Sequence, residues 1–139
     1  MILRLTNFNF TREERLKSKK MLGALFKGGN SFVAYPLRVV WLPAEAVQSA
    51  PQAFVQVAIS VPKRNFKTAV ERNLLKRRIR EAYRLNKQDL LEKIHPSGKP
   101  VALMIMYIAK EALTFAEIQA GVLKMIRKFP AEMPAGNQR

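Results

Sequence analysis

Basic side chains recur at helical spacing in one stretch of the sequence, where they could hold phosphate groups. Four cationic residues follow one another at intervals of four: Arg72, Lys76, Arg80 and Arg84. At about 100° per residue they share one side of a helix, and Asn73 and Arg77 fall within the same arc of about 140°. An arginine can bind a phosphate at two points, and a lysine supplies a compact positive charge. The spacing therefore predicts a helix face that binds phosphates.

Residues next to this row extend the candidate site. Lys63 and Arg64 lie just before the helix, whose N-terminus itself attracts anions. Asn73 is the uncharged member of the row. Its amide could hydrogen-bond a sugar, a base or a metal-bound water, or it could brace a local turn, and the sequence leaves both interpretations open.

The net charge of the chain is concentrated around the same helix. The formal net charge is +15, and residues 62–84 alone hold nine Lys or Arg against two acids. A solvated helix face normally mixes charges of both signs, because like charges four residues apart destabilise a helix by a few tenths of a kcal/mol per pair. The excess therefore predicts a polyanionic partner, most often a nucleic acid.

Residues for metal-dependent or nucleophilic catalysis are scarce. The chain has no cysteine, so it forms no disulfide, thiolate or Cys-based zinc site. His95 is its only histidine, in a turn-rich segment, and Asp89 is its only aspartate, while the glutamates are scattered. We expect no catalytic residue, no metal site and no cofactor bound by the protein itself.

Length and hydropathy bound the domain count and the compartment. A chain of 139 residues favours one domain, 1–139, with about 10–128 structured and frayed termini. The longest apolar run, Val101 to Ala109, falls well short of the roughly 20 residues of a membrane helix. Met1 to Phe10 lacks the apolar core of a secretory signal. We expect a cytoplasmic protein that does not bind membranes.

The first half of the chain predicts one helix and three strands. The helix runs over about 11–27, with Thr11 as its N-cap and Gly28-Gly29-Asn30 as its end. β-branched and aromatic residues predict strands over 31–35, 37–42 and 53–61, and a surface loop over 43–52.

The second half predicts a long helix, a strand and a last helix. They run over about 68–92, 101–108 and 114–128, with a turn-rich break at 95–100. The order α-β-β-β-α-β-α predicts an α/β (α+β) two-layer sandwich, with a four-stranded sheet and helices packed on it.

The basic helix also resembles the signature of a known family. Residues 72–80 fit the pattern R-N-x-x-K-R-x-x-R, which is similar to that of the bacterial ribonuclease P protein subunit. The strand and turn before it, residues 57–64, resemble the strand that leads into the family's lysine-rich turn. Residues 15–17 and 26–29 resemble its first helix and the turn that follows. The resemblance covers about residues 10–128.

This resemblance implies a fold and a function. The family fold has the element order given above and a left-handed β-α-β crossover. Its holoenzyme cuts precursor tRNA to make the mature 5′ end, and the catalyst is a large RNA subunit that holds Mg²⁺. The family protein binds this RNA and the 5′ leader of precursor tRNA, and no protein partner is implied.

The resemblance also assigns roles to residues of this chain. It places RNA contacts at Arg72, Asn73, Lys76, Arg77, Arg80 and the turn residues Lys63 and Arg64, and Arg84 extends the row. It places Phe26 in a leader cleft between the sheet and the first helix. The alternative is that Phe26 belongs to the helix core. Leu22 and Val40 stand where other members often carry aromatics. Other aromatic side chains could supply the missing rings of the cleft: Phe32 first, and also Tyr35 and Trp41.

Three other classes of protein remain as alternatives. A ribosomal or other structural RNA-binding protein would share the basic helix, although nothing would demand the R-N-x-x-K-R-x-x-R pattern after a P-K-R turn. A peripheral membrane protein would need the apolar helix face that the core already requires. A self-sufficient nuclease would need clustered acids or paired histidines.

Overall fold

The computed structural model describes residues 14–44 and 54–130. Their order, α-β-β-β-α-β-α, confirms the predicted one. The elements are α1 (Lys19–Gly28), β1 (Asn30–Ala34), β2 (Leu37–Pro43), β3 (Val55–Ser60), α2 (Ala69–Ile94), the 3-10 turn η3 (His95–Ser97), β4 (Val101–Tyr107) and α3 (Phe115–Lys128).

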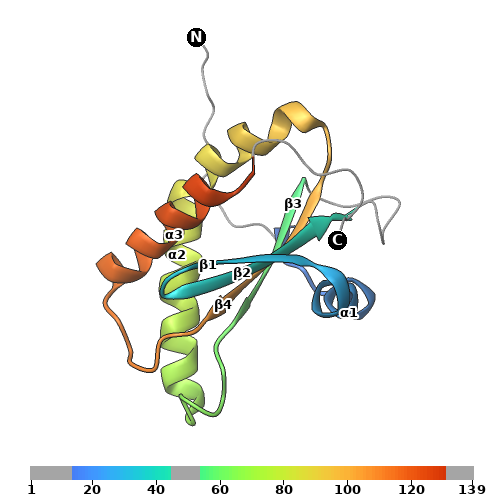
Figure 1. The fold of residues 1–139 in the computed structure, drawn as a ribbon. Helices are drawn as coiled ribbons and strands as arrows, with labels where there is room; N and C mark the ends of the chain where they lie inside the picture. Colours follow the sequence, from blue (N-terminus) through green and yellow to red (C-terminus); the bar gives the residue numbers. More distant parts are fainter. Residues whose placement is uncertain (1–13, 45–53, 131–139) are drawn as a thin grey trace.

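The four strands form one mixed sheet in the order β1-β2-β4-β3 (Figure 1). β2 pairs antiparallel with both β1 and β4, whereas β3 pairs parallel with β4. A parallel pair cannot be closed by a hairpin, so α2 forms the crossover between them. The crossover brings the long basic helix against the edge strand β3.

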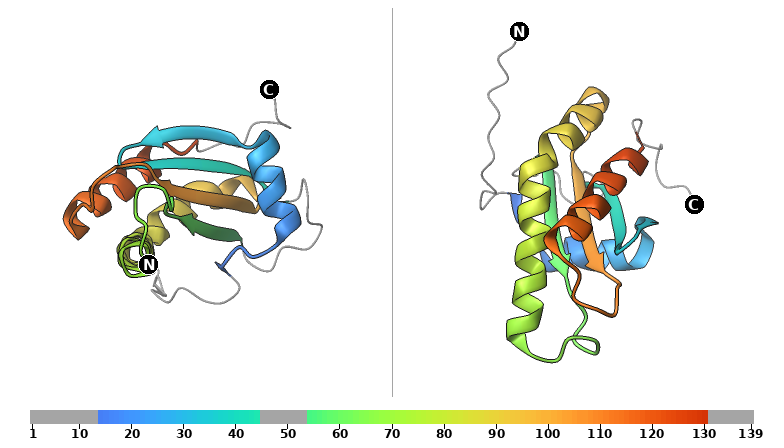
Figure 2. Two further views of the ribbon diagram at one scale, coloured as in Figure 1. Left: turned by 90° about the horizontal axis from the view of Figure 1, so that it is seen from below. Right: turned by 90° about the vertical axis from the view of Figure 1, so that its left-hand side faces the viewer.

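One face of the sheet is covered by α2 and α3 (Figure 2). Leu103 and Ile105 of the central strand β4 belong to the same buried cluster as the inner sides of both helices. The indole of Trp41 packs against the ring of Phe129 just after α3, with 5.0 Å between ring centroids. This cluster is the main core.

The other face of the sheet is only partly covered, by α1. Ala102 and Met104 point to this side and pack with Met21 and Leu25 of the helix. This short helix adds a partial layer to the predicted sheet-and-helix sandwich. The part of this face that α1 leaves uncovered includes one residue from each strand, aligned side by side across the sheet. Of these, Val33 and Arg38 are exposed, and Met106 and Ser60 are partly exposed.

The predicted start of the first helix is wrong. The helix begins at Lys19, and residues 15–18 are not helical. Leu16 is buried, and its amide donates to the Val57 carbonyl at 2.9 Å, so pairing with β3 overrides the helical propensity of this segment. The Ser18 hydroxyl, which accepts from the Met21 amide at 3.1 Å, caps the helix instead of Thr11. Thr11 itself lies outside the described residues.

The other boundaries agree with the sequence to within about two residues. The strands over 31–35 and 37–42 are confirmed as two strands with Pro36 between them. The long helix is confirmed and ends two residues later than predicted, at Ile94. Most of the predicted loop over 43–52 and the segment after Pro130 lie outside the described residues.

A glycine on α3 allows this helix to pack closely on the turn between β1 and β2. A Cβ atom at Gly121 would stand 2.6 Å from Pro36 Cδ and 3.2 Å from the Tyr35 carbonyl oxygen. Both neighbours belong to the backbone or to a rigid ring, so they cannot move aside without shifting the strands. The absence of a side chain at Gly121 therefore sets the distance between α3 and the sheet.

We expect Gly121→Ala to lower the free energy of unfolding by about 1–2 kcal/mol, because overpacking outweighs the gain in helix propensity. Gly23→Ala in α1 is the matched control, since a Cβ there meets nothing within 4 Å. It should stabilise the chain by about 0.5–1 kcal/mol. Urea unfolding of both variants measures the difference, and equal effects would contradict the close packing at Gly121.

Candidate nucleic-acid interface

The apolar side of α2 determines where its basic side chains lie. Leu75, Ile79 and Ala82 are fully buried in the main core. Because they anchor one side of the helix to the sheet, the basic row lies on the other side. There Asn73 and Arg77 are exposed. Arg72, Lys76, Arg80 and Arg84 are each partly exposed.

Arg72 is bound to the backbone of its own chain. Its Nη1 donates to the carbonyl oxygens of Phe66 and Lys67, at 2.9 and 3.0 Å. These bonds brace the turn that leads into α2, a role that the sequence had left open for Asn73. Arg78, at a variable position of the R-N-x-x-K-R-x-x-R pattern, likewise donates to the Leu113 carbonyl before α3. Two guanidinium groups of the helix therefore stabilise the fold.

Arg84 is paired with an acid one turn earlier. Its Nε and Nη2 donate to the two carboxylate oxygens of Glu81, at 3.1 and 2.6 Å. The hydrogen bond from Arg84 lowers the pKa of the Glu81 carboxyl, and the same bond raises the pKa of Arg84. The last cation of the row is therefore partly neutralised within the helix.

The remaining predicted residues are available to a ligand. Within the described part of the chain, no hydrogen bond or ion pair engages the side chains of Asn73 and Arg77. The same holds for Lys63 and Arg64, which are exposed in the turn before α2. Their positive charges therefore lie on the surface, and no acidic side chain of the described residues neutralises them.

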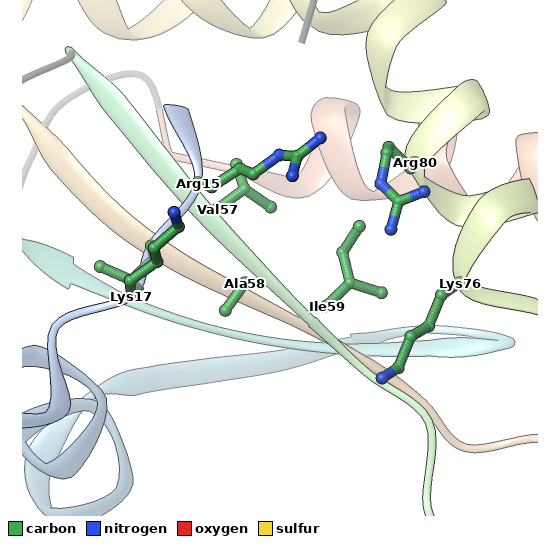
Figure 3. A pocket seen from close by; sticks show the side chains of 8 residues that line it. Arg15, Lys17, Val57, Ala58, Ile59, Lys76 and Arg80 are labelled. Carbon is green, nitrogen blue, oxygen red and sulfur yellow. The ribbon is translucent and has the colours of Figure 1, made fainter. Parts of the chain in front are cut away.

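A groove runs between α2 and the segment that precedes α1. It is a hollow of about 270 Å³ whose floor is the edge strand β3 at Val57, Ala58 and Ile59. Arg15 and Lys17 line it from the segment before α1, and Lys76 and Arg80 line it from α2; in Figure 3 the Arg15 guanidinium reaches over the strand toward Arg80. Four cationic side chains thus border an apolar strip, which we call the basic groove.

Arg15 and Lys17 are site residues that the sequence prediction missed. The prediction missed them because the helix predicted over 11–27 includes both residues, whereas the helix of the structure begins at Lys19. The signal that could have found them is alternation, since a buried Leu16 between exposed Arg15 and Lys17 is typical of an edge strand.

The aromatic candidates for a leader cleft separate into two groups. Phe26 on α1 is 66% exposed, so it is not a core residue. Phe32 was wrongly predicted for this cleft: it lies on the face that carries α3, with its ring 6.2 Å from that of Phe129. Trp41 is buried beside the same phenylalanine. The period of two along a strand sends both side chains away from α1.

Aliphatic residues occupy the face that α1 shares with the sheet. Leu22 and Val40 are partly buried there, against the small core cluster of α1. Tyr35 is 56% exposed in the turn between β1 and β2. Phe26 is therefore the aromatic side chain of α1 that is open to a ligand.

The described segments offer no clustered metal ligands and no membrane-spanning helix. Residues 14–44 and 54–130 contain no group of three or more His, Cys, Asp or Glu side chains that could hold a metal ion. None of the helices in these segments is long and apolar enough to cross a membrane.

Comparison with known sequences gives one consistent result. The family model described as Ribonuclease P matches residues 10–130. The chain is 30% identical over 128 residues to the ribonuclease P protein component of Porphyromonas gingivalis strain ATCC 33277. The alignment covers 92% of this chain and 91% of that protein.

Comparison with solved structures supports the fold. The RNase P protein of Staphylococcus aureus matches with a TM-score of 0.62 at 22% identity, over 82% of this chain and 93% of that one. The RNase P protein of Thermotoga maritima also matches with a TM-score of 0.62 at 22% identity, over 84% of this chain and 97% of that one.

Arg72 and Arg77 should differ in their effect on stability. Arg72→Ala removes two hydrogen bonds from a charged donor, so we expect the free energy of unfolding to fall by about 1–2 kcal/mol. Arg77→Ala removes a solvated charge among like charges and should change stability by less than about 0.5 kcal/mol. Thermal and urea unfolding of the two variants measure this contrast. A loss for Arg77→Ala as large as that for Arg72→Ala would show that Arg77 also braces the fold.

Proposed function

Because the chain belongs to the bacterial ribonuclease P protein family and so assists an RNA subunit in removing the 5′ leader of precursor tRNA, we propose that its basic helix binds the backbone of that RNA. The observation that carries this proposal is the set of partner-free cations beside a buried helix side. Arg77 is exposed on α2, and Lys63 and Arg64 lie in the turn before it. Phosphodiester groups would neutralise charges that the described chain does not.

Each member of the site has a distinct proposed role. Arg77 and Arg80 bind phosphates, and Lys76 adds charge at the edge of the basic groove. Asn73 hydrogen-bonds a sugar or a base next to them. Lys63 and Arg64 extend the contact toward the N-terminus of α2. Arg72 and Arg84 act mainly from within the chain, because their guanidinium groups are already bound there.

The 5′ leader is the second proposed ligand. A single strand of RNA binds best where cations border surfaces on which bases can stack. Phe26 offers an exposed ring beside the partly covered face of the sheet. Leu22 and Val40 supply apolar contact on this face but no ring. We propose that Phe26 provides the principal stacking contact.

The chemical step is assigned to the RNA. Magnesium ions held by that RNA would supply the activated water and the charge stabilisation for phosphodiester cleavage. The described acids of the protein do not cluster into an ion-binding group. The protein contributes by neutralising phosphates and positioning the leader, and alone it should be inert. The proposed compartment is the cytoplasm.

The salt dependence of RNA binding tests the first proposal. Each phosphate contact contributes roughly 0.7–0.9 to the slope of log affinity against log salt. Arg77→Ala with Arg80→Ala should therefore flatten the slope for the catalytic RNA by about 1–2. Affinity for this RNA should fall much more than affinity for the leader.

The control for this experiment is Lys128→Ala, which removes a cation that donates to the Val33 carbonyl on the opposite edge of the sheet. It should leave the slope unchanged. Equal flattening by both variants would indicate unspecific attraction, as expected of a general RNA-binding protein.

Phe26→Ala tests the leader contact. We expect the reconstituted holoenzyme to lose about 5- to 150-fold in affinity for precursor tRNA, since stacking on a base contributes roughly 1–3 kcal/mol. Mature tRNA, which lacks the leader, should bind as before. Because the ring is exposed, the melting temperature should change little. Equal losses for both tRNAs would assign Phe26 to general RNA affinity.

A further inference from the structure

A buried ion pair joins the segment before α1 to the C-terminal half of α2. The ammonium of Lys87 lies 3.0 and 2.8 Å from the two carboxylate oxygens of Glu14. The side chains are 5% and 14% exposed, so water screens this pair far less than the exposed pair of Glu81 and Arg84. The buried hydroxyl of Tyr83 lies nearby: burial raises its pKa, and the Glu14 charge raises it further. The contact links residues that are 73 positions apart.

The residues next to Glu14 are attached to the sheet. Arg15 forms a parallel bridge with Val57, and the Leu16 amide donates to the Val57 carbonyl at 2.9 Å. Leu16 is 6% exposed and packs in the small core cluster with α1. The segment is therefore held by a strand contact to β3, an apolar anchor at Leu16 and the ion pair at its start. The ion pair attaches the segment directly to α2.

This attachment works against electrostatic repulsion. Arg15 and Lys17 face Lys76 and Arg80 across the basic groove. The like charges of the two walls repel each other, and this repulsion opposes the approach of the segment to the helix. Glu14 supplies a negative charge at the end of one wall. It forms an ion pair with Lys87, which lies two turns beyond Arg80 on the same side of α2. The ion pair thus adds an attraction between the same two elements that the cations push apart.

We propose that Glu14 and Lys87 are positioning residues that hold Arg15 and Lys17 opposite α2, so that the basic groove grips an RNA phosphodiester backbone from both sides. This inference rests on the proposed function of the α2 cations and adds a second wall to that site. Without the pair, α2 presents one row of cations. With it, a strand of RNA lies over β3 between two rows.

The test uses a variant that removes the pair without changing the net charge. Glu14→Gln with Lys87→Met replaces one positive and one negative charge by neutral groups of similar size. We expect the Leu16 amide to exchange its hydrogen at least tenfold faster in this variant of the free protein. Glu81→Gln with Arg84→Met removes the exposed pair of the same helix and should leave Leu16 exchange unchanged.

Binding to the catalytic RNA provides the functional readout. Arg15→Ala with Lys17→Ala should flatten the salt slope by about 1–2 in the natural background. In the background that lacks the ion pair the slope should already be flatter, and the same two changes should add nothing to it. The same cycle with precursor and mature tRNA on the holoenzyme identifies which RNA occupies the groove, because only a leader contact distinguishes these two ligands.

The reversed pair, Glu14→Lys with Lys87→Glu, protects the test against a failure to fold. It restores the attraction and should restore both Leu16 protection and the salt slope. The proposal is overturned if Arg15 and Lys17 contribute equally with and without the pair, or if the folded reversed pair leaves Leu16 exchange fast. If Arg15→Ala with Lys17→Ala has no effect in the natural background, the second wall is wrong. A slope still flattened by Arg77→Ala would then leave the proposed function of α2 intact.

Discussion

The burial of one side of α2 against the sheet is the interaction on which the rest of the structure depends. Burying a Leu or Ile side chain contributes about 1.5–3 kcal/mol, whereas a pair of like charges four residues apart costs a few tenths of a kcal/mol. Leu75 and Ile79 are fully buried, so packing outweighs the repulsion along the basic row. The helix can therefore carry an excess of cations and remain packed against the sheet.

The cations around this helix fall into two groups, those bound within the chain and those exposed to solvent. Some are satisfied within the chain: Arg72 and Arg78 bind backbone carbonyls, and Arg84 and Lys87 bind carboxylates. Others face solvent, foremost Arg77 in the middle of the helix. The same residue type thus serves both to brace the structure and to bind a ligand. The difference lies in what each guanidinium can reach, which helical spacing alone does not reveal.

Local patterns were sufficient to predict most of the fold. The long helix, the strands around Pro36 and the last helix follow from periodicity and from turn residues. The start of α1 could not be predicted in this way, because the conformation of residues 15–18 depends on a hydrogen bond from the Leu16 amide to the Val57 carbonyl, about forty residues away. A tertiary contact of this kind overrides the helical propensity of a segment that carries a plausible cap and first turn.

The candidate site was predicted in part, for a related reason. Residues on one helix, such as Lys76 and Arg77, share a side by geometry alone. The opposite wall of the basic groove comes from a distant segment, and Arg15 lies there because this segment pairs with β3. Phe32 illustrates the converse error, since its aromatic type fitted the leader cleft but its position in the strand turns it toward Phe129.

The central claim is that RNA covers the basic side of α2, and lysine footprinting in the assembled holoenzyme tests it most directly. Lys76 and Lys63 should react with an amine-acetylating reagent in the free protein and become at least fivefold less reactive when the catalytic RNA is bound. Lys128, which contacts β1 at the other edge of the sheet, should react equally in both states. Unchanged reactivity of Lys76 and Lys63 in a fully assembled, active holoenzyme would contradict the account.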